Sequence, residues 1–242
     1  MRSLGKYFIF LGSLFVNRES FKTYVRLVID ESILVGVGSI FIVVIVSTFM
    51  GAVTAVQTAY NLVSPLIQDY IISTIVRDMT VLELAPTIIA LVFAGKVGSS
   101  ISSGLGTMRI SEQIDALEVM GINSASYLVL PKIIASVIMY PLLVILAMFL
   151  SIYGGYLAGT LTNIITEQEY VYGIRADFNE FTIKFAMIKA VVFAFLISSI
   201  SAYKGFYTEG GALEVGIAST SAVTNSCIAI LLADYLLAQL LL

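Results

Sequence analysis

Few residues of this chain could carry out chemistry, because the usual catalytic side chains are almost missing. The sequence contains no histidine, which removes the commonest general base and the commonest metal ligand. Its one cysteine, Cys227, lies in an apolar run and is predicted to be a small packing residue. A disulfide between two cysteines of this sequence and a cysteine metal cluster are therefore excluded, and we expect no metal site and no cofactor.

The sequence also lacks a P-loop, the nucleotide-binding loop of many ATPases, even where it comes nearest to that motif. Lys96 follows Gly95, but a P-loop needs a glycine five positions before Gly95 and a serine or threonine after the lysine. Ala90 and Val97 occupy those two positions. Any ATP hydrolysis that this chain uses is therefore expected to come from another subunit.

The composition points to a membrane protein. Hydrophobic residues make up 59% of the chain and charged residues 12%, with a mean hydropathy of +0.99, whereas soluble domains are about 45–50% apolar and about 25% charged. One soluble core of this size cannot bury so much apolar surface. The net charge of −3 and the lack of a basic run give no field for nucleic acid, so we expect no nucleic-acid partner.

Five apolar stretches are long enough to cross a bilayer, whose core of about 30 Å needs about 20 helical residues. The sequence thus predicts an all-α integral membrane fold. The second stretch is imperfect because it carries several charges, and Pro86 is expected to kink it. A turn around residues 61–65 separates it from the first. The predicted spans are residues 31–57, 68–104, 125–160, 183–203 and 215–241.

The N-terminal residues 1–27 combine aromatic and basic side chains without the long apolar core of a signal peptide. That pattern is typical of an interfacial helix that lies on the membrane. The distribution of lysine and arginine predicts a cytoplasmic N-terminus. With five spans, the C-terminus and the acidic loop at 167–180 would then lie outside.

Glu83 is the carboxylate set most deeply in an apolar stretch, and a charge within a span is by default a functional hypothesis. We consider that it borders a ligand, pairs with Arg77 or a partner-chain cation, or snorkels to the outer interface. Asp234 lies nearer the end of its stretch, which favours an interfacial position. An intramembrane hydrolase would need paired aspartates at mid-membrane, and Asp69, Asp78 and Asp234 form no such pair.

Small residues recur at spacings that let helices approach closely in lipid. Gly95, Gly98 and Gly106 lie along the second stretch, and Gly155 and Gly159 form a GxxxG pattern in the third. These strips fit either packing within one chain or the contact surface of a homodimer.

Residues 109–121 are predicted to form a short amphipathic helix between the second and third spans. Ile110, Ile114 and Leu117 share one face, and an arc of acidic residues lies opposite. Gly121 and Asn123 are expected to end the helix in left-handed conformations. Such a helix suits a protein that receives force from a motor, although a solvated helix without a partner has the same pattern. The acidic arc consists of Glu112, Asp115 and Glu118.

A long block at residues 83–132 carries a family pattern. It contains E-L-A-P at 83–86, A-G-K-V-G-S at 94–99, L-G-T-M-R at 105–109, E-Q-I-D-A-L at 112–117, M-G at 120–121 and Y-L at 127–128. This block resembles the MlaE/YrbE family of ABC-transporter permeases, and further glycines and small residues at 205–226 also look like that family. The resemblance covers most of the chain from about residue 30 onward.

The sequence departs from the family pattern at several charged positions. Lys96 and Lys132 replace the usual arginines, which keeps the charge but loses the two-pronged guanidinium. Residues 103–104 are Ser-Gly where the family usually has Ala-Glu, and Leu82 stands where some members have arginine. These departures concern ion pairing and partner choice.

The resemblance implies one permease domain over residues 1–242, in a homodimer in the inner membrane of a double-membrane bacterium. The implied partners are a cytoplasmic ABC ATPase, a periplasmic MCE-domain protein and phospholipid. On this basis helix 109–121 is a cytoplasmic coupling helix, Glu83 and Pro86 lie at a lipid pocket, and the five glycines above serve helix packing or the dimer. The expected ATPase contacts are Arg109, Glu112, Asp115, Leu117, Glu118 and Met120.

An ion-coupled secondary transporter or channel is the alternative that the residues leave open. That class predicts inverted repeats and charges near the membrane midplane. Neither feature is convincing in this sequence.

Overall fold

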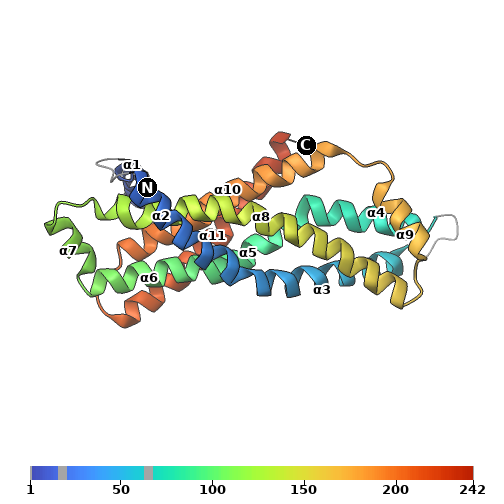
Figure 1. Cartoon of the computed structure of the whole chain (residues 1–242), viewed down its shortest axis with the longest axis horizontal. Coiled ribbons are helices and arrows are strands. Elements are labelled where there is room, and N and C mark those ends of the chain that lie inside the picture. Colours follow the sequence, from blue (N-terminus) through green and yellow to red (C-terminus); the bar gives the residue numbers. More distant parts are fainter. Residues whose placement is uncertain (1, 16–20, 63–67, 242) are drawn as a thin grey trace.

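A computed structural model describes residues 2–15, 21–62 and 68–241, and within these ranges every regular element is a helix. The helices form one elongated bundle (Figure 1). The predicted turn at 61–65 falls mostly outside the described residues. The elements are α1 Arg2–Ser13, α2 Phe21–Ser32, η1 Ile33–Val37, α3 Gly38–Asn61, α4 Tyr70–Met79, η2 Thr80–Ile88, α5 Ile89–Phe93, η3 Ala94–Gly98, α6 Ser99–Ile110, α7 Gln113–Val119, α8 Ser124–Leu161, α9 Glu167–Arg175, α10 Glu180–Phe206 and α11 Ala212–Leu241.

The prediction of five spans is confirmed, since five helices among the described residues are long and apolar enough to cross a membrane. The chain is a multi-pass membrane protein. The first two spans are composite: Phe21–Asn61 joins α2, η1 and α3, and Tyr70–Ile110 joins α4 to α6 through η2 and η3. Both are longer than predicted, because α2 extends the first span at its start and α6 continues the second span to Ile110.

The predicted single interfacial helix at 1–27 is wrong in its extent. The structure has α1 at Arg2–Ser13, while α2 begins at Phe21 and runs directly into the first span. Phe10 of α1 is buried against Tyr203 and Phe206 near the end of α10, whereas Phe8 and Ile9 are exposed. The exposed apolar side of α1 has the chemistry of a helix in contact with lipid.

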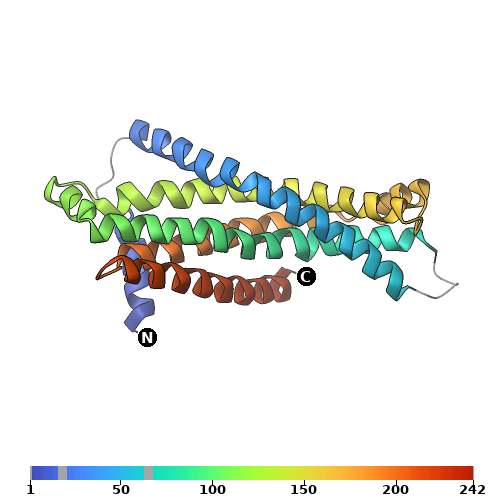
Figure 2. The same cartoon turned by 90° about the horizontal axis from the view of Figure 1, so that it is seen from below.

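The elements divide between the two ends of the bundle. Figures 1 and 2 show α1, α7 and the α10–α11 connection at one end, which we call the α7 end. The end of α3, the start of α4 and the short helix α9 lie at the other, which we call the α9 end. The arrangement agrees with the predicted alternation of the connections between two sides of a membrane.

The helices α3 and α8 approach each other closely through their backbones. A Cβ placed on Gly51 would lie 1.7 Å from the Ser151 carbonyl oxygen, and one on Gly154 would lie 2.1 Å from that of Thr48. The Ser151 hydroxyl also donates to the Ser47 carbonyl at 2.7 Å. Glycine at these two positions therefore allows the two spans to touch through their main chains.

Three π-helical segments interrupt the first two spans, and such segments are frequent at functional sites because they re-aim carbonyls and side chains. η2 contains Glu83 and Pro86, while η3 contains Lys96. Glu83 and Lys96 thus lie where the helix of the second span is irregular, whereas Arg77 and Asp78 lie in the regular helix α4.

Candidate functional site

Charged side chains from three spans meet beside Glu83. The ammonium of Lys189, in α10, lies 2.7 Å from Glu83 Oε1 and 2.6 Å from Asp234 Oδ1 of α11. The Thr87 hydroxyl lies 3.2 Å from Glu83 Oε2 and 3.4 Å from Asp234 Oδ2. We call Glu83, Thr87, Lys189 and Asp234 the Lys189 cluster, and it links η2, α10 and α11.

The backbone around Pro86 also takes part in this cluster. Lys189 Nζ donates to the Leu82 carbonyl at 3.1 Å. The Pro86 carbonyl accepts from the buried Tyr140 hydroxyl at 2.6 Å. Proline has no N–H to donate within the helix, and this part of the span is π-helical. Two carbonyls of η2 thus accept from side chains of other spans.

The Lys189 cluster is acidic on balance, with two carboxylates and one ammonium. The Lys189 side chain is fully buried and lies 4.7 Å from the centre of the Phe185 ring, whereas 48% of the Glu83 side chain is exposed. Asp234 is intermediate, at 17%. The surplus negative charge is thus accessible from outside the bundle at Glu83, whereas the Lys189 ammonium that pairs with it is buried.

Of the alternatives considered for Glu83, the ion pair with Arg77 is wrong. Arg77 is buried at the α9 end, where Nε pairs with Asp78 at 2.8 Å and Nη1 donates to the carbonyls of Ile174 and Ala176 at 2.8 and 2.6 Å. Arg77 thus fastens the end of α9 to the second span. Asp234, for which an interfacial position is favoured by the sequence, pairs with Lys189 and thus belongs to the same cluster as Glu83.

Lys189 is the member of the cluster that the sequence reasoning missed. The signal was present, since Lys189 lies well inside the predicted span 183–203, where an uncompensated charge is costly. Its partners lie 106 and 45 residues away, respectively, so no local spacing reveals them.

An apolar groove lies beside Leu84, the residue next to Glu83. The groove has a volume of about 520 Å³ and is lined mainly by α3. The Glu83 carboxylate itself does not line this groove, which reaches the second span at Leu84. The lining residues are Ile45, Val46, Phe49, Met50, Val53, Thr54, Gln57 and Leu84.

The helix predicted at 109–121 is shorter in the structure, where α7 covers Gln113–Val119. Glu112 adopts a left-handed conformation with φ 59°, which separates α7 from α6 and leaves Arg109 in the last turn of α6. The left-handed Gly121 is confirmed, with φ 80°. Asn123 is instead extended and caps α8 by accepting from the Ser126 N–H at 3.2 Å.

The outer side of α7 combines acids with exposed apolar residues. Ile114 is completely buried and Leu117 is half-buried, so this side of α7 faces the bundle. Asp115 pairs with Arg109 at 2.5 Å, and Glu118 accepts from the Ser124 hydroxyl at 2.8 Å. Two adjacent apolar side chains project beyond them: Val119 is 88% exposed and Met120 65%.

Four of the five marked glycines contact other parts of the same chain. A Cβ on Gly98 would meet Ser201 at 2.9 Å, one on Gly106 would meet Val215 at 3.2 Å, one on Gly155 would meet Tyr170 at 2.6 Å, and one on Gly159 would meet Ile165 at 2.8 Å. Gly95 differs because nothing lies within 4 Å of its Cβ position.

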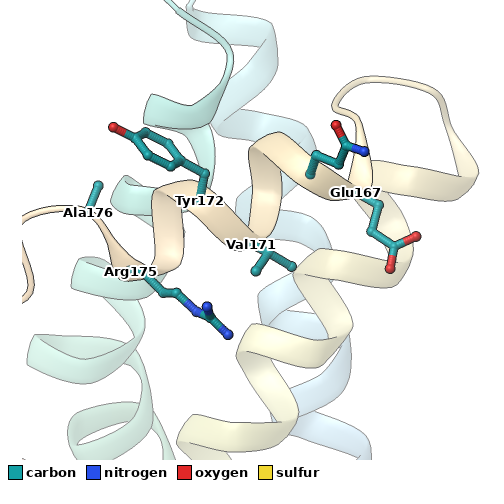
Figure 3. A pocket seen from close by; sticks show the side chains of 6 residues that line it. Glu167, Val171, Tyr172, Arg175 and Ala176 are labelled. Atoms are coloured by element: carbon teal, nitrogen blue, oxygen red, sulfur yellow. The ribbon is translucent and has the colours of Figure 1, made fainter.

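At the α9 end, a shallow groove of about 640 Å³ runs along α9. Figure 3 shows Val171 and Arg175 extending from one side of this helix and Tyr172 from the other. A capping box begins α9: the Thr166 hydroxyl accepts from the Glu169 N–H, and the Glu169 carboxylate accepts from the Thr166 N–H and hydroxyl. These bonds lower the pKa of Glu169, with the side-chain bond as the larger cause.

Comparison with known proteins relates this site to membrane permeases. The family described as Permease MlaE matches residues 28–240. A probable ABC transporter permease protein of Rickettsia bellii is 37% identical over 99% of this chain and 92% of its own length. A probable ABC transporter permease protein of Synechocystis is 31% identical over 97% of this chain and 89% of its own length.

A plant relative matches a shorter stretch. The chloroplastic protein Trigalactosyldiacylglycerol 1 of Arabidopsis thaliana is 36% identical over 65% of this chain and 45% of its own length. The bacterial alignments extend over nearly the whole of both chains. The family match covers all or nearly all of each of the five spans. This chain therefore belongs to the MlaE family of ABC transporter permeases.

Proposed function

We propose that this chain is the inner-membrane permease subunit of an ATP-driven phospholipid transporter of a bacterium. Two copies form the permease, a cytoplasmic ABC ATPase binds at the α7 end, and an MCE-domain protein binds at the α9 end. The observation that carries the lipid assignment is the half-exposed carboxylate of Glu83, held by a buried lysine next to an apolar groove. This pairing of polar and apolar surface fits an amphipathic substrate.

Two further observations support the proposal. The bacterial relatives carry the name ABC transporter permease, a class that works with an ATPase, and the Arabidopsis relative has the name of a glycolipid. In addition, Val119 and Met120 form an exposed apolar tip on α7 with acids beside it. Such a tip fits a hydrophobic cleft rimmed by cations, which is the surface we expect on the ATPase.

The lipid assignment is tested by photocrosslinking. A photoreactive amino acid at Leu84 should label phospholipid that stays bound during purification, and one at Leu231, an exposed position on α11, serves as the lipid-exposed control. After removal of bulk lipid, labelling should persist at Leu84 and fall at Leu231. Equal loss at both positions would argue against a retained lipid beside Glu83.

The coupling role of α7 is tested by reversing two of its acids. Asp115→Lys with Glu118→Lys should leave the permease folded, because 51% of the Asp115 side chain is exposed and Glu118 is also exposed. The repulsion should reduce co-purification of the ATPase and abolish ATP-driven lipid transport. The matched control is Glu167→Lys with Glu180→Lys at the α9 end. Full ATPase retention with normal transport would exclude α7 from coupling.

The dimer is tested with the accessible Gly95 position. In a Cys227→Ser background, Gly95→Cys should crosslink two chains, whereas Lys184→Cys near the start of α10 should not. Monomeric protein by light scattering, together with no crosslink at Gly95, would contradict the homodimer.

The Lys189 cluster also favours a second candidate, an ion-coupled transporter, because it sets charges inside the spans. The two functions differ in their energy source. Lipid transport by vesicles that contain permease and ATPase should require ATP and proceed without an ion gradient. Transport driven by a proton or sodium gradient without ATP would select the alternative.

A further inference from the structure

A second charged cluster lies nearer the α7 end, where α2 and α3 meet η3, α6 and α8. Its centre is a small cavity of about 60 Å³ lined by two lysines, a glutamate and two serines. Lys132 forms an ion pair with Glu31, and Lys96 donates a hydrogen bond to the Gly38 carbonyl. We call Glu31, Ser39, Lys96 and Lys132 the Lys96 cluster.

The Lys96 cluster is basic on balance. The charges of Lys132 and Glu31 cancel as a pair, and among the described residues Lys96 has no carboxylate within ion-pair distance. Lys96 is exposed at the mouth of the cavity, so its ammonium is accessible to a ligand. One positive charge therefore remains uncompensated within a membrane span, where charge is costly.

Ser39 supplies an independent sign that the cavity is incomplete. The residue is only 2% exposed, and its hydroxyl has no hydrogen-bond partner among the described residues. A buried hydroxyl without a partner costs free energy, so native proteins normally provide one. Ser39 lines the same cavity as Lys96. A hydroxyl donor and an ammonium donor thus share a space that the chain does not fill.

An oxyanion satisfies both groups, because it accepts hydrogen bonds and neutralises the ammonium. The surroundings favour a lipid as its source. Leu34 is 63% exposed at the cavity, and Val97 and Ile101 also line it. A lipid reaches this opening laterally and covers the apolar residues with its glycerol and acyl groups, whereas free phosphate would have to enter the apolar spans from water.

We infer that the cavity of the Lys96 cluster binds the phosphate group of a membrane phospholipid, with Lys96 as counter-charge and Ser39 as hydroxyl donor. The site is distinct from the Lys189 cluster, which is acidic and surrounds a different lysine. That a transported lipid occupies this site on its way through the permease rests on the proposed function. Binding of the lipid itself requires neither ATP nor the ATPase.

The absence of tryptophan from this sequence allows a direct test. Leu34→Trp introduces a single fluorescent reporter at the cavity, and the full-length permease in mixed micelles is titrated with brominated phosphatidylglycerol or brominated diacylglycerol. The phospholipid should quench at about a tenfold lower mole fraction than the diacylglycerol, which lacks the phosphate. Such a preference is the size expected for a charge-assisted hydrogen bond.

Variants in the Leu34→Trp background identify the groups responsible. Lys96→Gln should weaken phospholipid quenching about tenfold, and Lys96→Arg should preserve it, because arginine retains the charge. Ser39→Ala should weaken it severalfold without loss of folded protein. Lys184→Gln, an exposed lysine on α10, is the matched control and should have no effect.

Several results would overturn the inference. Equal quenching by both lipids would show that the phosphate contributes nothing, and unchanged quenching in Lys96→Gln would remove the proposed counter-charge. Relief of quenching by millimolar inorganic phosphate would assign the cavity to a free anion. A failure of the proposed transport function looks different, because binding would persist while ATP-driven lipid movement is absent.

Discussion

The Lys189 cluster and the Lys96 cluster share one helix and one kind of backbone irregularity, yet differ in charge and burial. Both lie on the span Tyr70–Ile110, at η2 and η3 respectively. The 13 residues from Glu83 to Lys96 correspond to about 20 Å of helix. The first cluster has a covered cation and a surplus acid, and the second has an exposed cation without an acid of its own.

The hydrogen bonds of the two lysines show what this difference means. An ammonium has three donors, and Lys189 lies within bonding distance of Glu83, Asp234 and the Leu82 carbonyl. Lys96 has one acceptor recorded among the described residues, the Gly38 carbonyl. The Lys189 cluster therefore compensates its cation with two carboxylates and ties three spans together, whereas the Lys96 cluster has donors to spare for a ligand.

Loss of the buried cation should have the largest effect. Lys189→Met leaves the two acids of its cluster without a counter-charge, and breaking a buried ion pair costs about 3–5 kcal/mol. Lys96→Met, at an exposed site, should cost less than about 1 kcal/mol. The measurement is folded protein after graded denaturant in micelles, followed by size exclusion. Equal losses in the two variants would remove the distinction between the clusters.

Removal of one acid from the Lys189 cluster should have a smaller effect than removal of the lysine. Either change leaves one carboxylate and one ammonium, which are balanced. Asp234→Asn should cost about 1–2 kcal/mol because this side chain is mostly covered, and Glu83→Gln less than about 1 kcal/mol because its side chain is half exposed. The same denaturation assay ranks them, and the reverse order would place the surplus charge on Asp234.

Ser39 should show an unusually small effect for a buried polar residue. Ser39→Ala removes a hydroxyl that has no hydrogen-bond partner among the described residues, so stability should change by less than about 0.5 kcal/mol or rise slightly. Ser151→Ala is the matched change, since it removes the hydrogen bond to Ser47 and should cost about 1 kcal/mol. A large loss in Ser39→Ala would mean that the hydroxyl already has a structural role.

Glu169, a carboxylate outside the spans, should have the smallest effect on stability. Unlike the residues of the two clusters, it acts only on the local stability of α9. The lowered pKa of Glu169 means that its ionised form stabilises the α9 cap. This stabilisation is fully present above the ordinary pKa of 4.5 and is lost as the pH falls through the lowered folded value. Hydrogen exchange of α9 amides, corrected for the intrinsic rate, should accelerate in that window in the native chain and not in Glu169→Gln.

The sequence was sufficient for features that depend on the lengths of apolar runs. Five spans follow from hydropathy, and the left-handed Gly121 follows from glycine's freedom at positive φ. The break before α7 was not predictable in the same way, because Glu112 is a residue that rarely adopts positive φ. The boundary of α7 therefore depends on how α6 and α8 position the connection between them.

The ion pairs were harder to predict than the spans. The sequence marks Glu83 by its charge within an apolar stretch, but it offers only Arg77 or a cation of a partner chain as a counter-charge. The structure instead joins Glu83 to Lys189, 106 positions away, because three spans pack together there. Lys189 also carries a charge within a predicted span, which is the signal that could have indicated the pair.

The glycine contacts between α3 and α8 have a mechanical consequence. Backbone against backbone at Gly51 and Gly154 leaves no flexible side chain between the helices that could absorb a displacement. Sliding one helix past the other would drive the Ser151 carbonyl against a main chain, so α3 and α8 should translate and tilt as a single rigid rod. Any opening and closing of the protein must then occur by hinges at the edges of this pair, with α3 and α8 carried along together.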